Sequence, residues 1–396
     1  MNNIKTNKNI IKLFIICELL CFFFVIIKHK YVSDYFGVDV TVSNNNIILF
    51  FIGIIFLYLS YYYSWIKTTL FFNSRKKFKS LSNLNSLFLI LVILYFIFLI
   101  KTGVGKVTIA SEPKNLLNGF EKIIFLPIIL LKINFLIYLY AAGCRNKNKI
   151  YYLSLIIFVI AELYRGVSFP ILLLGIIEYK KWKKYAKLRY IFVFFPILLL
   201  FINTVYNLKY MMRMGDEYTY IDILQTSLML AGRLSVLSNI LYNYEHIESL
   251  RNAINSYSYN PVSEFLEKLT PMPSLFGIND KIIEFGKIIF ENSYGRLDSA
   301  IAISVMGMIF VIPDKLYIIM SILFFSYIFI HFIIGKLDCS NEQNIVAFFF
   351  VLLTLYQGFW GILANYLYSL FVYLLIVIIN QMLVVGLRNN CEQSIN

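Results

Sequence analysis

The residues of this chain that could do chemistry gather in one polar stretch, residues 208–315, where arginine is the most informative type. A guanidinium group stays charged at any relevant pH, and its planar donors match phosphate or carboxylate oxygens. Arginines in this stretch or beside apolar runs are Arg165, Arg213, Arg233, Arg251 and Arg296. Because an arginine near hydrocarbon is costly unless it is paired or hydrated, the set predicts a site for an anionic ligand at a membrane face. Alternatively, single arginines reach lipid head groups or pair with Glu217 and Asp298.

Proton transfer would fall to the acids and to one histidine. If the anion is a phosphate-activated sugar, the attacking hydroxyl needs an acceptor for its proton. The candidates are Glu162, Glu217, Glu264, Asp298 and His246. Together with the arginines they give a predicted catalytic set of Arg165, Arg233, Arg296, Glu162 and Asp298. The predicted substrate-binding set is Arg213, Arg251, His246 and Tyr294.

Neither a metal site nor a cofactor site is predicted. The three histidines, His29, His246 and His331, are far apart and have no partner at the spacing of metal ligands. Asp34 and Asp39 are close together, but they are a weak signal for a metal. No phosphate-binding loop, dinucleotide fingerprint or nucleophile elbow occurs in the structural context that it would require.

The composition decides which elements must position these residues. Of the 396 residues, 59% are hydrophobic, more than the surface of a soluble fold accommodates. We therefore expect an all-α polytopic membrane protein with about ten transmembrane helices. The net charge of +14 comes largely from short segments beside apolar runs. Such charges set orientation and meet lipid head groups, so no nucleic-acid partner is predicted.

Apolar runs divide the chain into three parts. Residues 1–207 hold seven predicted spans, 208–315 form one large extracytoplasmic loop, and 316–396 hold three more spans and a cytoplasmic tail. The predicted spans are 11–27, 47–66, 85–100, 123–142, 150–164, 167–178, 190–207, 316–335, 345–360 and 363–386. The fifth and sixth are short and form a tight hairpin.

Two further apolar stretches lie inside the large loop. Residues 299–312 are brief and end at Pro313, so we expect an interfacial or re-entrant helix, although an eleventh span is the alternative. Residues 221–241 are long enough to span. Their polar residues, with Arg233 in mid-helix, favour a helix lying against the membrane.

Charge counting predicts the orientation. With the N-terminus in the cytoplasm, the inside segments hold 19 Lys and Arg residues and the short outside loops hold seven. The positive-inside rule then places both termini in the cytoplasm and the large loop on the outer side of the membrane. We expect this membrane to be the cell's inner (plasma) membrane. Two charges, Glu18 and Lys132, fall within predicted spans, and we expect them to pair with each other inside the bundle.

The overall plan resembles the O-antigen and capsule repeat-unit polymerases, the Wzy family. The matching pieces are the hairpin sequence Glu162-Leu-Tyr-Arg165-Gly166, the segment Gly232-Arg233-Leu234-Ser235, and Gly295-Arg296 leading into 299–335. The resemblance covers most of the chain in architecture but only these residues in detail.

This resemblance implies a glycosyltransferase-type polymerase that uses no cofactor. Its substrate would be an oligosaccharide on undecaprenyl pyrophosphate within membrane lipid, and a chain-length regulator would be a further partner. Arg165, Arg233 and Arg296 would then clamp the pyrophosphate, with Arg213 in support.

Three rival functions stay open. A polysaccharide ligase or another lipid-linked glycosyltransferase would have a similar plan, and some such transferases use an acid in the first outer loop, where Asp34 and Asp39 lie. A flippase or transporter of lipid-linked oligosaccharide should show internal repeats and small, balanced loops, and this sequence has neither. A membrane acyltransferase would need an essential histidine, and none of the three histidines has a supporting motif.

Overall fold

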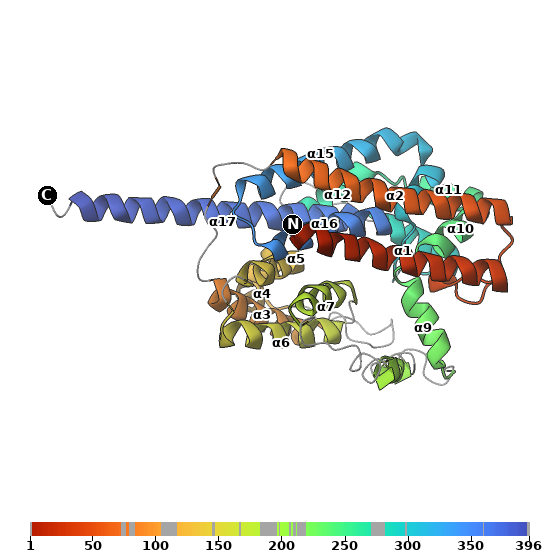
Figure 1. The fold of residues 1–396 in the computed structure, drawn as a ribbon, viewed down its shortest axis with the longest axis horizontal. Helices are drawn as coiled ribbons and strands as arrows, with labels where there is room; N and C mark the ends of the chain where they lie inside the picture. Colours follow the sequence, from red (N-terminus) through yellow and green to blue (C-terminus); the bar gives the residue numbers. More distant parts are fainter. Residues whose placement is uncertain are drawn as a thin grey trace.

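The chain is an all-α membrane protein (Figure 1). The computed structural model describes residues 2–72, 77–78, 84–103, 117–144, 147–165, 168–182, 196–197, 199–205, 207–208, 211, 219–270, 282–297, 299–358 and 360–393. Within these residues there are isolated β-bridges but no strand. The long apolar helices are α1 (Asn2–Lys28), α2 (Asn44–Phe71), α3 (Leu84–Thr102), α4 and α5 (Gly119–Ile124 and Leu126–Gly143), α15 (Leu316–Lys336) and α17 (Trp360–Gln393).

Six segments of the described chain are long and apolar enough to cross a membrane, and all six coincide with predicted spans. Three further predicted spans form the shorter helices α6 (Lys149–Arg165), α7 (Ser168–Trp182) and α16 (Asn341–Gln357). The remaining predicted span, 190–207, falls largely on residues outside the described part. The total of about ten spans therefore stays a prediction.

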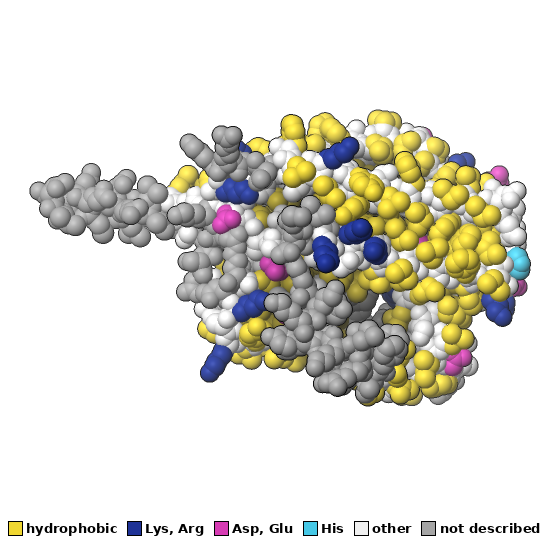
Figure 2. Space-filling model, viewed as in Figure 1, with side chains coloured by type: hydrophobic (Ala, Val, Ile, Leu, Met, Phe, Trp, Pro, Cys, Tyr) yellow, Lys and Arg dark blue, Asp and Glu magenta, His cyan; other side chains and the backbone are white. Residues whose placement is uncertain are grey.

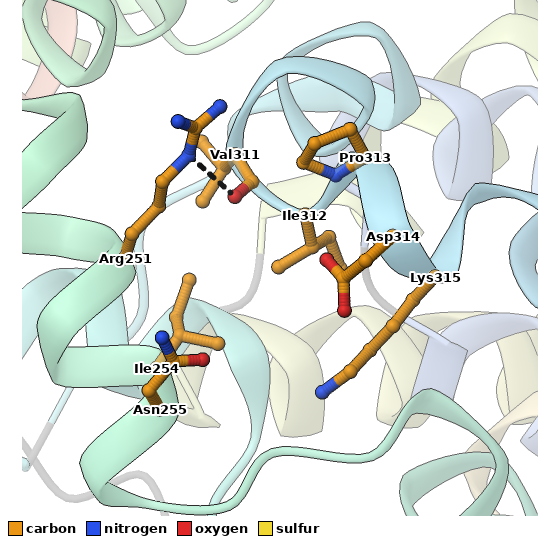
Figure 3. Close-up of a pocket in the computed structure, with 8 residues that line it drawn as sticks. All are labelled: Arg251, Ile254, Asn255, Val311, Ile312, Pro313, Asp314 and Lys315. Atoms are coloured by element: carbon orange, nitrogen blue, oxygen red, sulfur yellow. Dashed lines mark hydrogen bonds between the residues drawn. The ribbon is translucent and has the colours of Figure 1, made fainter.

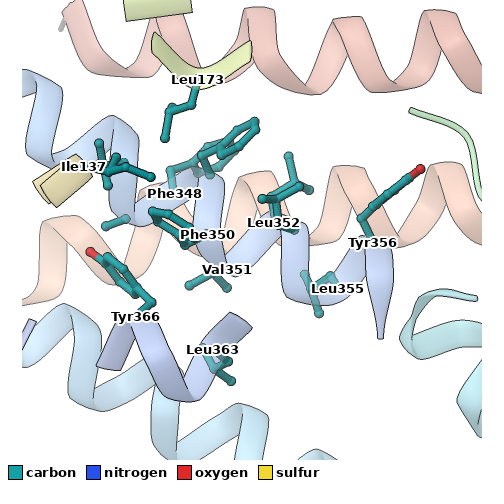
Figure 4. Packing of buried hydrophobic residues seen from close by; sticks show 14 of the residues in the cluster. Ile137, Leu173, Phe348, Phe350, Val351, Leu352, Leu355, Tyr356, Leu363 and Tyr366 are labelled. Atoms are coloured by element: carbon teal, nitrogen blue, oxygen red, sulfur yellow. The ribbon is translucent and has the colours of Figure 1, made fainter. Parts of the chain in front are cut away.

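Helix α16 lies at the centre of the bundle and is buried on all sides (Figure 4). It begins with a capping box, in which Ser340 and Gln343 each accept a hydrogen bond from the other's backbone N–H. Phe348 and Leu352 pack among apolar residues of α5, α7 and α17. A helix that is apolar on every face has no side suited to water, so burial against other helices is its stable arrangement.

The outer surface of the bundle is apolar as well. Helix α1 exposes Ile16, Leu20, Phe23 and Ile27 in one stripe, and α2 and α15 expose similar rows. Figure 2 shows hydrophobic side chains covering most of the visible surface over these helices. An exposed apolar belt of this extent suits contact with lipid chains.

Hydrogen bonds between loops show which loops lie together at each end of the bundle. The loop between α1 and α2 is hydrogen-bonded to the large loop, residues 208–315, because the hydroxyl of Tyr31 and the backbone N–H of Val42 both donate to Glu245. At the opposite end, Phe78, after α2, donates its backbone N–H to Lys336, the last residue of α15, and accepts a hydrogen bond from the backbone N–H of Asp338. The loops predicted to share a side of the membrane therefore meet in space. Which end faces the cytoplasm stays a prediction.

The described part of the large loop folds into short helices that pack on the bundle. They are α9 (Ile223–Gly232), α10 (Leu237–Glu245), α11 (Ile247–Ser256), α12 (Pro261–Leu269), α13 (Phe285–Tyr294), α14 (Ser304–Val311) and the 3₁₀ turn η4 (Pro313–Lys315). Helix α12 lies against α17, and α14 lies against α16. This part of the large loop therefore packs directly against helices of the membrane bundle.

Two expectations concern the large loop. The single helix expected over 221–241 is wrong, because the chain breaks into α9 and α10 and Arg233 caps the end of α9. The cause is a buried acceptor, Glu18, that binds the chain at the break. Helix α14 has eight residues, about 12 Å of helix, which is too short to cross a bilayer. The interfacial or re-entrant position expected for 299–312 stays a prediction.

Candidate functional site

Arg233 stands on a turn that three separate contacts fix in place. Its backbone carbonyl accepts a hydrogen bond from the hydroxyl of Tyr356, near the end of α16. Gly232 packs on the loop after α1, so closely that a Cβ there would lie 2.7 Å from the backbone nitrogen of Ser33. The third contact is with Glu18 in α1. The side chain of Arg233 is nevertheless exposed, so a rigid backbone presents a charged group to the surroundings.

Glu18 holds this turn from inside α1. Its carboxylate is fully buried and accepts hydrogen bonds from the Ser235 hydroxyl (2.6 Å), the Val236 backbone N–H (3.0 Å) and the Tyr58 hydroxyl (3.0 Å). Val236 is the N-cap of α10, so the negative charge lies at the positive end of that helix dipole. The prediction that Glu18 pairs with Lys132 is wrong, because the Glu18 carboxylate instead accepts hydrogen bonds from residues at the start of α10.

Lys132 has different partners. Its ammonium group donates to the backbone carbonyl of Lys268 and, at 2.7 Å, to the side-chain oxygen of Asn365 in α17. Lys268 belongs to the last turn of α12, whose carbonyls have no partner within the helix. Lys132 itself has φ of 58°, which interrupts α5 and turns the side chain toward α12. The two intramembrane charges thus bind opposite kinds of helix end.

Asp34 is a second acid beside the Arg233 turn, and in the sequence it is only a weak signal. Its carboxylate accepts a hydrogen bond from Asn239 at 2.9 Å, and its backbone carbonyl accepts one from Tyr294. Asp34 keeps an exposed edge, but the surrounding loop and helices crowd its carboxylate, and this burial raises its pKa. The positive charge of Arg233 and the Asn239 hydrogen bond oppose that rise. Arg233 and Asp34 therefore act on each other electrostatically.

An aromatic stack connects two of the predicted substrate-binding residues. The ring of Tyr294 lies 6.1 Å from Tyr35, Tyr35 lies 3.7 Å from Tyr242, and Tyr242 lies 4.3 Å from His246, all nearly parallel. Tyr294 and His246 are exposed at the two ends of the stack. Nδ1 of His246 also lies 2.9 Å from the carbonyl of Tyr242. The stack offers flat apolar faces with polar rims next to Asp34.

Arg296 follows α13, the helix that ends with Tyr294. Gly295, with φ of 67°, ends α13 in a left-handed conformation that suits glycine, and the chain turns there. The guanidinium of Arg296 then lies over the ring of Phe290, 5.9 Å from its centroid, and stays exposed. Arg296 is thus two residues from Tyr294, whose hydroxyl binds the backbone of Asp34.

Arg165 and Glu162 form a second group, at the end of α6. The hydroxyl of Tyr95 in α3 donates to Glu162 (2.7 Å) and receives a hydrogen bond from Arg165 (3.3 Å). The other carboxylate oxygen of Glu162 is buried and has no partner among the described residues. Glu162 is therefore a carboxylate with one unused acceptor beside an arginine.

Arg165 and Arg233 lie at the same end of the bundle. Phe169, in the first turn of α7, packs its ring 5.8 Å from that of Tyr356, and Tyr356 binds the backbone of Arg233. Helix α6 ends at Arg165 and α7 begins at Ser168, so the hairpin expected from the sequence brings Arg165 toward this end. Tyr356 of α16 thus contacts both the start of α7, which follows Arg165, and the backbone of Arg233.

Arg251 lies elsewhere and has a structural task. It donates to the carbonyls of Phe310 (2.8 Å) and Val311 (3.3 Å), at the C-terminal end of α14. Its side chain also borders a pocket with Asp314 and Lys315 (Figure 3). The predicted site residues Arg213 and Asp298, and the alternative acid Glu217, lie outside the described residues.

Comparisons with known proteins give no relative: no protein-family model, curated protein or solved structure matches this chain. Among the described residues, no group of three or more His, Cys, Asp or Glu side chains is arranged to hold a metal ion. The chemistry of the site therefore has to be argued from its side chains. They offer exposed guanidinium groups on a fixed backbone, two carboxylates in crowded surroundings and a row of aromatic rings.

Proposed function

We propose that this chain polymerises lipid-linked oligosaccharide repeat units at the outer face of the inner membrane, with both termini in the cytoplasm. The substrate would be a short oligosaccharide on undecaprenyl pyrophosphate. The terminal hydroxyl of one unit attacks the anomeric carbon of the growing chain. The bond from that carbon to the diphosphate breaks, and the electron pair leaves with the diphosphate.

The observation that carries the proposal is the exposed guanidinium of Arg233 on a turn held by Gly232, Tyr356 and Glu18. Negative charge grows on the departing diphosphate during the reaction. A cation that is already fixed in place stabilises this charge without reorganisation in the transition state. Arg165, at the same end of the bundle, supplies a second cation, and Arg296 a third near Tyr294.

The proton of the attacking hydroxyl needs an acceptor. One carboxylate oxygen of Glu162 has no partner within the described part of the chain, and the other shares Tyr95 with Arg165. Asp34 lies beside Arg233, and from the described residues its carboxylate accepts one side-chain hydrogen bond, that of Asn239. We assign Asp34 as the proton acceptor because it has an exposed edge, whereas Glu162 is fully buried. Glu162 is then a positioning residue for Arg165.

The test is complementation of a strain that lacks this chain and makes the lipid-linked repeat units. Single repeat units without chains in the deletion strain support a polymerase, whereas long chains that are not attached to their acceptor support a ligase. Build-up of repeat units that never reach the outer face supports a flippase. Arg233→Gln should lower polymer formation by roughly 10²–10³. Normal polymer ladders from this variant at normal expression would refute the role of Arg233.

A further inference from the structure

Asn239, in the first turn of α10, is a buried amide that binds two acceptors at once. Its side-chain nitrogen donates to the Asp34 carboxylate and to the backbone carbonyl of Ala302, each at 2.9 Å. Its side-chain oxygen is buried and has no hydrogen-bond partner among the described residues. In the flipped orientation that oxygen would face two other acceptors, so the nitrogen has to point at Asp34 and Ala302. The amide is therefore placed for donation.

The second acceptor connects Asn239 to the end of α16. Ala302 is followed by two residues that bind the last turn of that helix. The backbone N–H of Ile303 donates to the carbonyl of Gln357 at 3.2 Å, and the hydroxyl of Ser304 donates to a second carbonyl of the same turn at 2.7 Å. Ser304 has φ of 62°, a left-handed conformation that is unfavourable for residues other than glycine. These contacts fix the carbonyl of Ala302 to which Asn239 donates.

The same turn of α16 also holds Arg233. The hydroxyl of Tyr356, within that turn, donates to the backbone carbonyl of Arg233 at 2.5 Å. One end of α16 thus supports Arg233 through Tyr356 and Asp34 through Asn239. A carboxylate and a guanidinium that are supported from one helix end keep a fixed separation. The proposed reaction needs such a separation, because loss of the proton and departure of the diphosphate belong to one geometry.

The hydrogen bond from Asn239 also acts on the charge of Asp34. Burial raises the pKa of this carboxyl, and the charge of Arg233 and the Asn239 hydrogen bond oppose that rise. A donor favours the ionised form, which is the form that can accept a proton. Within the described part of the chain, the other titratable groups around Asp34 are three tyrosines, Tyr35, Tyr294 and Tyr356.

We propose that Asn239 is the positioning residue of the proton acceptor. It holds the Asp34 carboxylate at a fixed place beside Arg233 and keeps it ready for the proton of the attacking hydroxyl. Asn239 does not touch the reacting atoms and acts through Asp34. Its catalytic purpose rests on the proposed function, whereas its hold on Asp34 can be measured in a chain that forms no polymer.

Labelling of the Asp34 carboxyl measures this hold. A water-soluble carbodiimide and an amine convert a protonated carboxyl to an amide, and peptide mass spectrometry of the full chain in detergent gives the labelled fraction at each pH. Asn239→Leu is close in size and has no donor. The midpoint of Asp34 labelling should rise by about one pH unit, because the ionised form loses a hydrogen bond. Asp39, exposed in the same loop, is the internal reference, and its labelling should not change.

Two further variants separate positioning from packing. Asn243→Leu makes the same change one turn further along α10, where the buried amide donates to the carbonyl of Asn239 and the hydroxyl of Tyr35. This variant should leave the midpoint of Asp34 labelling where it is. Asn239→Asp keeps the shape of the side chain and places a second carboxyl beside Asp34, so the midpoint should rise further than in Asn239→Leu.

Polymer formation by isolated membranes at a series of pH values tests the purpose of the contact. The probe is the lipid-linked repeat units that accumulate in the deletion strain. A rise of one unit leaves about tenfold less ionised Asp34 at low pH, so Asn239→Leu should form about tenfold less polymer there and recover as the pH rises.

The outcomes distinguish this inference from the proposed function. Equal labelling midpoints in Asn239→Leu and the wild-type chain would overturn the inference, and so would an equal rise in Asn243→Leu. A loss of polymer that is the same at every pH would also overturn it, because a purely structural role predicts that result. If the midpoint rises but the wild-type chain forms no polymer, the hold on Asp34 stands and the proposed function is wrong.

Discussion

The carboxylate of Glu18, in α1, accepts a hydrogen bond from the hydroxyl of Ser235 at 2.6 Å, although 217 positions separate the two residues. The contact brings a charge inside a membrane span to the first turn of a short helix in the large loop. Short helices leave up to four backbone groups unpaired at each end, and lipid cannot bind them. A charged side chain at such an end satisfies these groups and complements the helix dipole.

The same relationship recurs at three other helix ends. Glu264 accepts the first backbone N–H of α13, from Phe285. Lys132 donates to the last turn of α12, and Arg251 donates to the last turn of α14. In each case the sign of the charge opposes that of the helix end. Charges used in this way are structural, whereas Asp34, the proposed proton acceptor, keeps an exposed edge beside Arg233.

Glu18→Gln should destabilise the chain, because an amide has only one acceptor oxygen for the donors that the carboxylate now binds. Each buried polar group left without a partner costs about 1–3 kcal/mol. We expect a lower midpoint of thermal unfolding for purified Glu18→Gln in detergent, and a smaller loss for Ser235→Ala. In a double-mutant cycle the two changes should be non-additive by about 1 kcal/mol. Additive effects would show that the two side chains do not act together.

Lys132→Met keeps the length of the side chain but removes the donor to Lys268 and Asn365. The end of α12 then loses its partner inside the bundle, and we expect a loss of about 1–3 kcal/mol in stability. Lys122→Met is the control, because Lys122 is exposed on neighbouring α4. Protease protection of residues 261–269 measures the effect locally. Equal protection in both variants would refute the role of Lys132.

The sequence predicts the long helices well and the use of the charges poorly, for one physical reason. An apolar run such as that of α2 or α15 specifies a span from its own length, because the bilayer sets the required number of residues. The partner of Glu18 depends on how α9, α10 and α1 pack together, and no local pattern encodes this. The predicted pairing of Glu18 with Lys132 rests only on their opposite charges. In the structure, each of the two charged groups instead forms hydrogen bonds at the end of a short helix.

The candidate site shows the same division. Arg165 and Arg233 could be selected from the sequence because arginine near hydrocarbon is unusual. The position of Arg251 at the end of α14 could not be predicted, because the ends of so short a helix are not marked in the sequence. Asp34 was recognisable only as an acid in the first outer loop. Its closeness to Arg233 arises because Gly232 lets α9 contact the backbone of that loop.

Gly232→Ala should separate Asp34 from Arg233. The added Cβ would lie 2.7 Å from the Ser33 nitrogen and 2.8 Å from its Cα, and backbone atoms cannot yield as a flexible side chain can. Overpacking of this kind typically costs about 1–3 kcal/mol. We expect polymer formation to fall as it does in Arg233→Gln. Gly175→Ala in α7 is the matched control, since no atom of the described residues lies within 4 Å of its Cβ position. Full polymer formation by Gly232→Ala would show that the close contact is not required.

Glu264 should make the stability of the chain depend on pH. Burial raises the pKa of this carboxyl to about 7, although the hydrogen bond from Phe285 opposes the rise, as does the charge of Lys268. Its usual pKa is 4.5, so between about pH 4.5 and 7 the folded chain binds a proton that the unfolded chain has lost. Stability contributed by this group is therefore present at low pH and is lost as the pH rises toward 7.

The size of the effect follows from the shift. A change from 4.5 to about 7 corresponds to about 3 kcal/mol, as an order of magnitude. Glu264→Gln keeps an acceptor for the Phe285 N–H and removes the charge, so it should stabilise the chain at pH 8 and flatten the dependence below pH 7. Thermal unfolding of the purified protein between pH 5 and 8 measures this, with Glu248→Gln on exposed α11 as control. An unchanged slope in Glu264→Gln would mean that another group titrates in this range.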